Sequence, residues 1–315
     1  MNVIFFGTSE FAVSAFSALL ASRHKILAVV CAPDKGKGRG QIVSLSPIKA
    51  LAKSKNLPIL QPANLREPQF IQFLKAQAPD LFIVCAYGKI LTKEVLAIPL
   101  KYAINLHGSL LPKYRGAAPI NWAIINGERQ SGVTLFKMDE YMDKGEVLLR
   151  KSVEISLTDT SVTLAEKLAR LSGAALIEAL DLIEQGKAVF SKQDESQVSF
   201  APKLKKEDGL IDWASAAWQI HNRIRGLAPW PGAFTYLGGK LLKIWESKVI
   251  AGQNSGAPGE IVEADSKKGL LITTGQERLL ITVLQLAGKR KMSAGEFILG
   301  HRVKAGERLE EKWLK

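Results

Sequence analysis

Short apolar runs alternate with helical patterns along the first 190 residues. Strands are predicted at residues 3–6, 26–31, 81–85 and 103–106. Helices are predicted at residues 10–21, 46–54 and 69–76, where apolar side chains recur at helical spacing. Continuous apolar strands that alternate with helices are typical of a mostly parallel sheet covered on both faces. The pattern therefore predicts an α/β domain with a doubly wound sheet.

The composition of the chain changes near residue 190, from alternating apolar segments to polar and charged residues. Before that point, two strands at 132–138 and 146–153 are joined by the polar loop DEYMDKGE, and a long helix is expected at 161–185. Residues 186–212 are polar and charged. Charge and flexibility suit a domain boundary, so we predict a basic linker at 191–207.

The C-terminal part carries the pattern of a small all-β domain. A helix is expected at 214–225, and short apolar runs then recur between turn signals. The pair Gly238–Gly239 between β-rich runs predicts a hairpin. Several short strands within roughly 80 residues indicate a barrel of the OB type, which binds oligonucleotides. The expected domains are 1–190, the linker 191–207, and 208–315.

The net charge of +13 points to a polyanionic partner. Residues 201–315 contribute +7 of it, although they are the shorter part of the chain. Neutralising phosphates releases counterions and stabilises a complex, whereas the alternative is a basic surface that only keeps the chain soluble. The glycine-rich segment KGKGRG (35–40) predicts a loop that carries cations into solvent, either for phosphate contact or merely solvated.

The sequence gives little support for a membrane protein, a secreted protein or a metal-binding protein. No apolar stretch reaches the ~18 to 20 residues that span a bilayer, and the N-terminus lacks the basic start of a signal peptide. Cys31 and Cys85 are the only cysteines, without a CxxC motif or a nearby histidine, so we expect buried thiols rather than a zinc site or a disulfide. These features favour a reducing cytoplasm.

An amide and an imidazole lie at the end of one predicted strand. Asn105 and His107 are two positions apart, which places their side chains on the same face. Ligands of doubly wound sheets bind at the carboxyl ends of strands. The amide offers a neutral donor, and the imidazole offers a base or a cation near neutral pH. The pair suits chemistry on one small electrophile, the alternative being a packing histidine.

Such a base usually requires a carboxylate that orients it. The loop between the strands at 132–138 and 146–153 supplies four acidic candidates, namely Asp139, Glu140, Asp143 and Glu146. Gly145 allows a tight turn beside Asp143, which makes Asp143 attractive. Composition alone does not decide between Asp143 and Asp139, and a solvated acidic loop is the simpler interpretation.

The stretch AINLHGSLLPKYRGAAP (103–119), followed by MDEYMDKGE, resembles the catalytic signature of the folate-dependent formyltransferase family. The resemblance covers nearly the whole chain and implies a Rossmann-like formyl-transfer domain, a basic linker and an OB-like C-terminal domain. The family's catalytic triad falls on Asn105, His107 and Asp143. Its tetrahydrofolate-binding stretch falls on Ser109, Leu110, Leu111 and Pro112.

This resemblance also implies a reaction and its partners. The formyl group of 10-formyltetrahydrofolate, a co-substrate, would pass to the α-amine of methionine on the initiator tRNA without a metal. The family's tRNA-reading insertion matches KGKGRG, with Arg39 at the position of the arginine that enters the acceptor arm. We expect a monomer that binds no membrane and contacts tRNA through three basic clusters: Lys35, Lys37 and Arg39; Lys203, Lys205 and Lys206; Lys289, Arg290 and Lys291.

Three other functions share some of these features. A sugar-nucleotide N-formyltransferase has the same catalytic stretch but predicts no need for the +13 charge or the KGKGRG loop. A formyltetrahydrofolate hydrolase would use water as the acceptor. A non-catalytic RNA-binding protein would rely on its barrel, and the three candidate catalytic residues would then be incidental.

Overall fold

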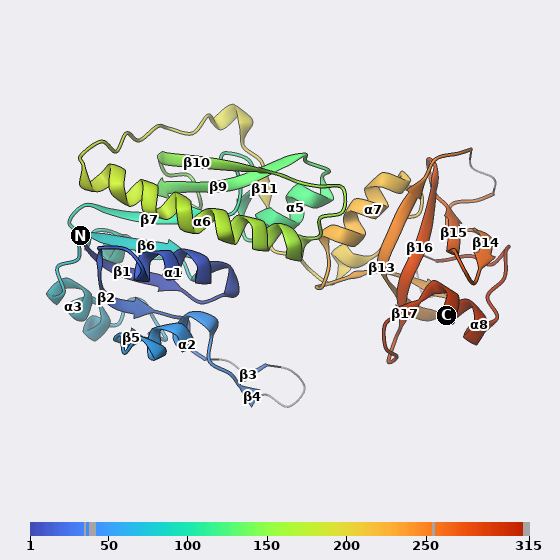
Figure 1. Cartoon of the computed structure of the whole chain (residues 1–315), viewed down its shortest axis with the longest axis horizontal. Coiled ribbons are helices and arrows are strands. Elements are labelled where there is room, and N and C mark those ends of the chain that lie inside the picture. The colour runs from blue at the N-terminus through green and yellow to red at the C-terminus, as the bar shows by residue number, and fades with distance from the viewer. Residues whose placement is uncertain (35, 38–41, 254–255, 311–315) are drawn as a thin grey trace. The chain divides into compact units, whose positions relative to one another are not determined.

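The computed structural model describes residues 1–34, 36–37, 42–253 and 256–310 (Figure 1). The chain divides into two compact units. The N-terminal unit comprises residues 1–119, 130–154 and 165–202, and the C-terminal unit comprises residues 120–129, 155–164 and 203–315. The predicted linker, 191–207, is therefore shared between the two units, with the division after Pro202.

A seven-stranded sheet forms the centre of the N-terminal unit, in the order β10-β9-β7-β6-β1-β2-β5. Its strands are β1 (Asn2–Gly7), β2 (Lys25–Val30), β5 (Ile59–Leu60), β6 (Leu81–Cys85), β7 (Tyr102–His107), β9 (Gln130–Lys137) and β10 (Val147–Glu154). The first five pair with one another in parallel, and β9 pairs antiparallel with both β7 and β10. The mostly parallel sheet predicted from the apolar runs is confirmed, and the strand order reverses between β1 and β6.

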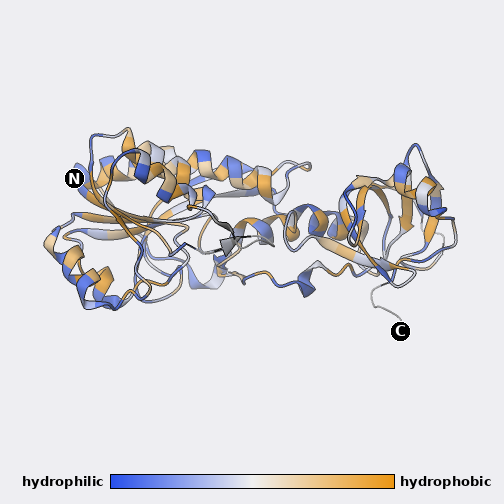
Figure 2. Ribbon diagram, turned by 90° about the horizontal axis from the view of Figure 1, so that it is seen from below, coloured by the Kyte–Doolittle hydropathy of each residue, from blue (hydrophilic) through white to orange (hydrophobic). Residues whose placement is uncertain are grey.

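Helices cover both faces of this sheet. They are α1 (Val13–Leu20), α2 (Pro47–Ser54), α3 (Pro68–Ala76), α4 (Lys93–Leu96) and α6 (Ser161–Glu184). Helix α5 (Pro119–Ile125) belongs, except for its first residue, to the C-terminal unit. Alternation along β1 sends Phe5 against Phe16 of α1, whereas Phe6 contacts Phe82 and belongs to the apolar cluster that includes Leu74 of α3. Figure 1 shows α1 and α6 in front of the sheet, and Figure 2 shows apolar strands at its centre.

The long helix α6 packs closely on α1. A Cβ atom added to Gly173 would lie 3.1 Å from the Ser14 carbonyl oxygen and 3.3 Å from the Ala18 Cβ. The glycine thus permits a close helix–helix approach. The predicted helix at 10–21 begins with a 3₁₀ turn, Glu10–Ala12, before α1 starts at Val13. The helix predicted at 161–185 matches α6 within one residue.

Three short pairings complete the N-terminal unit. β3 (Gly36–Lys37) pairs with β4 (Ile42–Val43), and β8 (Arg115–Gly116) pairs in parallel with β11 (Phe200–Ala201). Ser191 and Val147 exchange backbone hydrogen bonds of 2.8 and 2.9 Å. Residues 191–202, hereafter the 191–202 segment, therefore follow β10 and β8 and are anchored to both.

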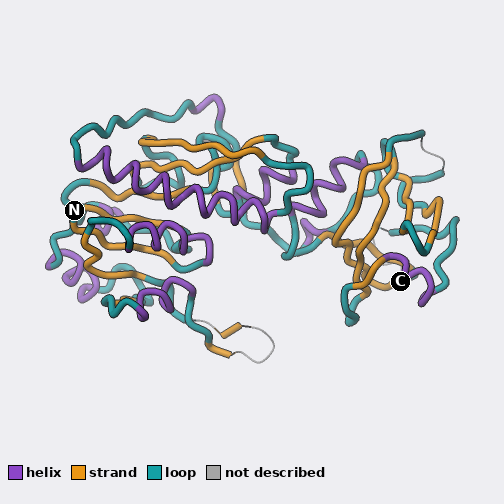
Figure 3. The backbone as a smooth tube through the Cα atoms, in the orientation of Figure 1, coloured by secondary structure: helices purple, strands orange, loops and turns teal. Residues whose placement is uncertain are grey.

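The C-terminal unit is mainly a β domain (Figure 3), and its strands pair antiparallel. Its elements are α7 (Ala217–Gly226), β12 (Ala233–Leu237), β13 (Lys240–Ile250), β14 (Ile261–Asp265), β15 (Gly269–Thr273), β16 (Arg278–Leu286), β17 (Met292–Ser293) and α8 (Ala294–His301). The strand order is β12-β13-β16-β15-β14. The predicted Gly238–Gly239 hairpin is confirmed, since Leu237 pairs with Lys240. Helix α7 starts three residues later than the predicted 214.

The last described residues join the two edges of this sheet. Glu310 exchanges backbone hydrogen bonds of 2.9 and 3.0 Å with Tyr236 of β12. Leu309 donates to the Gly259 carbonyl at 2.8 Å, and Ile261 of β14 donates to the Glu307 carbonyl at 2.8 Å. Both edge strands are thus paired by residues 307–310, which closes the sheet into a barrel and removes its exposed edges.

Candidate active site

His107 is the last residue of β7, and its ring is held by the backbone. Its Nε2 lies 2.9 Å from the carbonyl oxygen of Tyr114, and only 6% of the residue is exposed. A carbonyl can only accept, so Nε2 carries a hydrogen. Nδ1 is the other ring nitrogen, and it lies 3.7 Å from Oδ2 of Asp143. The imidazole orientation is therefore set, with Nδ1 facing the carboxylate of Asp143.

The structure brings Asp143, and none of the other three acidic candidates, to this imidazole. Its Oδ2 accepts a hydrogen bond of 2.8 Å from the Gly116 amide. Asp139 instead accepts from the Tyr141 amide within its own turn, and Glu140 is paired with Lys93 at 3.5 Å. The choice that composition left open is thus made by the fold.

The loop that carries Asp143 is tightly packed. Asp143 has a φ of +53°, in the left-handed region that asparagine and aspartate tolerate better than most residues. A Cβ atom on Gly145 would lie 1.8 Å from the carbonyl oxygen of Lys137. Gly145 is therefore required for the close approach of this loop to β9.

Asn105 lies two residues before His107 on β7 and is half-buried. Its alternation along the strand places its side chain on the His107 face. Within the part of the chain that the structure describes, its amide makes no hydrogen bond. Since a half-buried amide needs partners, this one is placed to bind a ligand or water.

We call the end of β7 with Asn105 and His107, together with the facing Asp143, the corner. Three consecutive residues, 114–116, hold it together. Tyr114, with a φ of +62°, presents its carbonyl to His107, and Gly116 presents its amide to Asp143. The Tyr114 amide donates to Ser199 Oγ at 3.0 Å, and the Arg115 amide donates to the Ser199 carbonyl at 2.9 Å. A Cβ on Gly116 would lie 2.6 Å from the Ala201 carbonyl oxygen. The corner thus depends on the 191–202 segment.

Sequence analysis missed the buried Arg115. Its guanidinium donates to Gln193 Oε1 and forms an ion pair of 3.0 Å with Glu195. The hydrogen bond from Arg115 is the main cause of a lowered pKa of the Glu195 carboxyl. These partners are about 80 positions apart, and no local pattern of a strand or helix connects them. The one signal in the sequence was the presence of a charged residue in the YRG stretch, next to the predicted site.

The predicted folate stretch forms a loop that is held by hydrogen bonds within the loop and to Thr134, Arg150 and Ser199. The Leu111–Pro112 peptide bond is cis. Ser109 Oγ donates to the Lys113 carbonyl at 2.6 Å, and Arg150 Nε donates to the Leu111 carbonyl at 2.7 Å. Ser109, Leu111 and Pro112 are buried, whereas Leu110 is half-buried. The side chain of Leu110 is therefore the most accessible of the four.

The predicted cationic residues have different surroundings. Lys35 and Arg39 lie outside the described residues, as does the side chain of Lys37. The remaining members are all exposed: Lys203, Lys205, Lys206, Lys289, Arg290 and Lys291. Arg290 is paired with Glu296 at 3.0 Å.

The barrel adds an aromatic ring to the third basic cluster. The Lys291 ammonium lies 3.6 Å from the centre of the Trp245 ring, and that of Lys243 lies 5.5 Å from it. Trp245 Nε1 donates to Gln285 Oε1 at 3.0 Å, which fixes the indole. We call Lys243, Trp245, Gln285 and Lys291 the Trp245 cluster; sequence analysis missed its aromatic member because β13 and residue 291 are distant in the chain.

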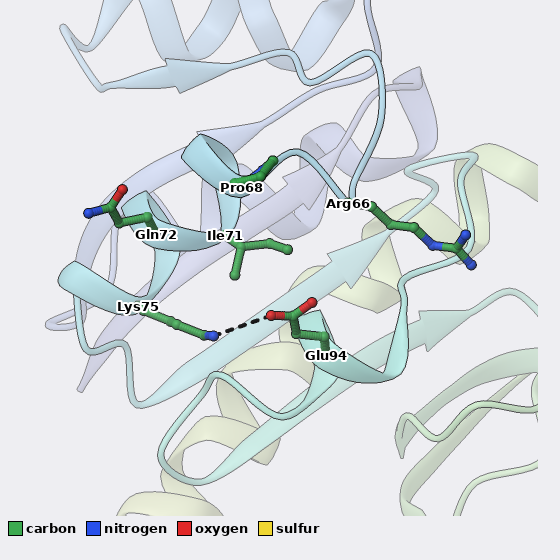
Figure 4. Close-up of a pocket in the computed structure, with 6 residues that line it drawn as sticks. All are labelled: Arg66, Pro68, Ile71, Gln72, Lys75 and Glu94. Atoms are coloured by element: carbon green, nitrogen blue, oxygen red, sulfur yellow. Dashed lines mark hydrogen bonds and ion pairs between the residues drawn. The ribbon is translucent and has the colours of Figure 1, made fainter.

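Two other features of the N-terminal unit are weaker candidates. Figure 4 shows a surface hollow beside α3 and α4, where Lys75 and Glu94 form an exposed ion pair of 3.3 Å. His24, Asp181 and Glu184 lie close enough to share a metal ion. Arg23 already bonds both of these carboxylates, and burial lowers the pKa of His24. None of the helices among the described residues combines the length and apolar composition that crossing a bilayer requires.

Known proteins match both units. The family model described as formyl transferase matches residues 1–180, and the formyl transferase C-terminal domain matches residues 203–302. A methionyl-tRNA formyltransferase of Caldanaerobacter subterraneus subsp. tengcongensis is 45% identical over 307 residues, covering 97% of this chain and 99% of that protein. One of Geobacter sulfurreducens is 42% identical, covering 99% of this chain and 97% of that protein.

The fold is also found in solved structures of low sequence identity. The sugar 3N-formyl transferase WlaRD, solved in the presence of dTDP and 5-N-formyl-THF, superposes with a TM-score of 0.68 at 20% identity, covering 92% of this chain and 99% of that one. The family models account for most of the chain, and the two full-length relatives share more than 40% of its residues. The chain belongs to the formyl transferase family.

Proposed function

We propose that this enzyme transfers the formyl group of 10-formyltetrahydrofolate to the α-amino group of methionyl-tRNA, which supplies formyl-methionyl-tRNA for translation initiation. The observation that supports the proposal is the 3.7 Å approach of His107 Nδ1 to Asp143 Oδ2 at the end of β7, the strand that also carries Asn105, in a chain similar over its full length to proteins named methionyl-tRNA formyltransferase. The cationic surface residues of the C-terminal unit suit a polyanionic acceptor.

The residues at the corner fit a formyl donor. Asn105 has amide hydrogens that no described residue accepts, and Leu110 offers a half-buried apolar side chain on the loop that follows β7. When bound, 10-formyltetrahydrofolate supplies an activated formyl carbon. No metal ligand set is needed, because the amide and imidazole themselves can stabilise negative charge and move a proton.

Each residue of the corner then has one task. The Asn105 amide donates to the formyl oxygen as negative charge develops there. His107, with Nε2 bound to the Tyr114 carbonyl, uses Nδ1 to take the proton from the attacking amine and to deliver it to the folate nitrogen as the bond between that nitrogen and the formyl carbon breaks. Asp143 Oδ2, held by the Gly116 amide, faces Nδ1 and stabilises the charged form of the ring.

We propose that phosphates of tRNA contact the three basic clusters. The Trp245 cluster adds to the third of them, because its ring lies within about 6 Å of two ammonium groups, of which Lys243 also donates to the Pro231 carbonyl and Lys291 is exposed. Replacing Arg39 with alanine is expected to raise the KM for tRNA and to reduce its salt dependence. Equal kinetics of this variant and the wild type at low and high salt would remove the 35–40 loop from the tRNA interface.

The decisive experiment offers two acceptors to one enzyme. The purified chain is incubated with radiolabelled 10-formyltetrahydrofolate and either methionyl-tRNA or an amino-sugar nucleotide. We expect label on methionyl-tRNA alone. Label on the sugar nucleotide would identify the other acceptor class, release of free formate in the absence of acceptor would indicate a hydrolase, and no turnover would indicate a binding protein. Sedimentation of the same sample is expected to give a monomer.

A further inference from the structure

Gln193 is a buried amide in the 191–202 segment, and all of its hydrogen bonds point toward the active corner. Only 7% of the residue is exposed. Its Oε1 accepts from Arg115 Nε at 3.1 Å and Nη2 at 2.8 Å. Its Nε2 donates to the Asp143 carbonyl at 2.8 Å and to the Gly145 carbonyl at 2.9 Å. Since arginine only donates and carbonyls only accept, the orientation of this amide is unambiguous.

The two carbonyls that Gln193 binds belong to the loop that carries Asp143. Asp143 has a left-handed φ of +53°, and such a backbone persists only where its surroundings hold it. The Gly116 amide holds the carboxylate of Asp143, and Gln193 holds its main chain. Two independent contacts therefore determine where Oδ2 lies relative to His107 Nδ1.

Arg115 connects this clamp to the opposite side of the corner. Its neighbours Tyr114 and Gly116 bind His107 and Asp143, and its own guanidinium binds Gln193. Glu195 balances the charge of the buried guanidinium through a bidentate ion pair, in which Nη2 and Nη1 of Arg115 donate to the two carboxylate oxygens at 3.0 and 3.3 Å. Residues 114–116 and 143–145 are thus joined through one side-chain amide.

We infer that Gln193 is a positioning residue for formyl transfer, which acts by holding Asp143 at the distance and angle that its task on His107 requires. The inference rests on the proposed function, because it names the reaction that this geometry serves. Gln193 itself touches neither substrate. Its removal should therefore slow the chemical step and leave substrate binding unchanged.

The variant Gln193→Glu tests the clamp selectively. The carboxylate keeps an acceptor for Arg115 but places a second acceptor against the carbonyls of Asp143 and Gly145, which are also acceptors. The matched control is Gln197→Glu, the same change at an exposed position of the same segment, where Nε2 donates to the exposed Asp194. We expect Gln193→Glu to lower kcat roughly 10- to 100-fold with unchanged KM for both substrates, and Gln197→Glu to match the wild type.

A double variant shows whether the effect passes through Asp143. In an Asp143→Asn background, Gln193→Glu is expected to cause little further loss of kcat, because the group that it positions is already altered. Equal losses in both backgrounds would overturn the inference. So would a kcat within about twofold of wild type in Gln193→Glu, or a rise in KM as large as the fall in kcat.

Two further outcomes keep the inference separate from the fold and from the proposed function. If Gln193→Glu does not fold, the neutral Gln193→Met replaces it, and failure of both to fold would make Gln193 a residue of the fold and overturn its positioning role. If the wild type itself transfers no formyl group to methionyl-tRNA, the proposed function fails first. An active wild type with an unimpaired Gln193→Glu variant would overturn the positioning role alone.

Discussion

The corner around His107 and the Trp245 cluster use polar side chains in opposite ways. At the corner, buried and half-buried groups are held by hydrogen bonds of fixed geometry, such as His107 Nε2 on the Tyr114 carbonyl and Asp143 Oδ2 on the Gly116 amide. In the Trp245 cluster, two ammonium groups share one ring, and Lys291 is exposed. The corner acts through position, and the cluster acts through charge.

This difference predicts separable kinetic effects. A preorganised group is worth most where charge or a proton moves, so its loss is seen in kcat. A surface cation adds to a field that many others share, so its loss is seen in KM and in salt dependence. Variants in the two regions should therefore change different constants.

The largest effect is expected at the corner itself. His107→Asn should lower kcat about 10²- to 10⁴-fold because the proton carrier is lost, and Asn105→Ala should lower it about 10²- to 10³-fold because the oxyanion donor is lost. The affinity for tRNA should remain as in the wild type. Formyl-transfer kinetics and a tRNA-binding titration measure the two quantities, with His301→Asn, at an exposed histidine, as the control. Near-normal turnover of both variants would remove the contrast between the regions.

A smaller effect is expected when a methyl group is added between the Asp143 loop and β9. Gly145→Ala places a methyl group within 1.8 Å of the Lys137 carbonyl oxygen, so the loop or β9 must move. We expect a loss of about 1 to 3 kcal/mol in the free energy of unfolding, and a lower kcat of the folded enzyme. Gly300→Ala in α8 meets nothing within 4 Å and should be neutral or stabilising by up to about 1 kcal/mol. Denaturant titration compares the two; equal stabilities would show that the corner tolerates movement.

Substitutions in the Trp245 cluster should alter binding only. Lys291→Gln and Lys243→Gln are each expected to raise the KM for tRNA several-fold and to reduce the slope of log KM against log salt by about 1 for each phosphate that is no longer neutralised. The kcat at saturating tRNA should not change. Lys268→Gln is the control, since Lys268 is already paired with Glu263 at 3.3 Å in the same unit. A fall in kcat with an unchanged salt slope would assign the cluster to positioning instead.

The smallest effect concerns stability and pH in the C-terminal unit. Burial lowers the pKa of His221, whose Nδ1 lies 3.0 Å from Ser247 Oγ. Because the folded pKa lies below the unfolded value of about 6.5, the neutral ring stabilises the fold above that pH, and this contribution is lost as the pH falls through the folded pKa. The Tm of wild type should therefore fall between pH 7 and pH 5, and His221→Asn should flatten this fall by about 1 to 3 °C. An unchanged slope in calorimetry would exclude His221 as its source.

Prediction from the sequence succeeded where the signal was local. Apolar runs predicted the strands β1, β2, β6 and β7, and a glycine pair predicted the hairpin between β12 and β13. Asn105 and His107 were proposed as site residues because a strand end and a period of two are both visible in neighbouring residues, and their catalytic role stays a prediction. The resemblance to formyltransferases added Asp143, which the residue pattern by itself left undecided against Asp139.

The amino-acid sequence by itself thus determined the class of fold and the place of Asn105 and His107 at a strand end, because periodicity and strand ends are properties of neighbouring residues. The tertiary structure decided which carboxylate faces the imidazole, since that depends on the backbone of Tyr114 and Gly116 meeting the loop at 143–145. It also decided the roles of Arg115 and Gln193, which lie 78 positions apart. Their hydrogen bonds exist only after distant segments have packed, and no local pattern encodes them.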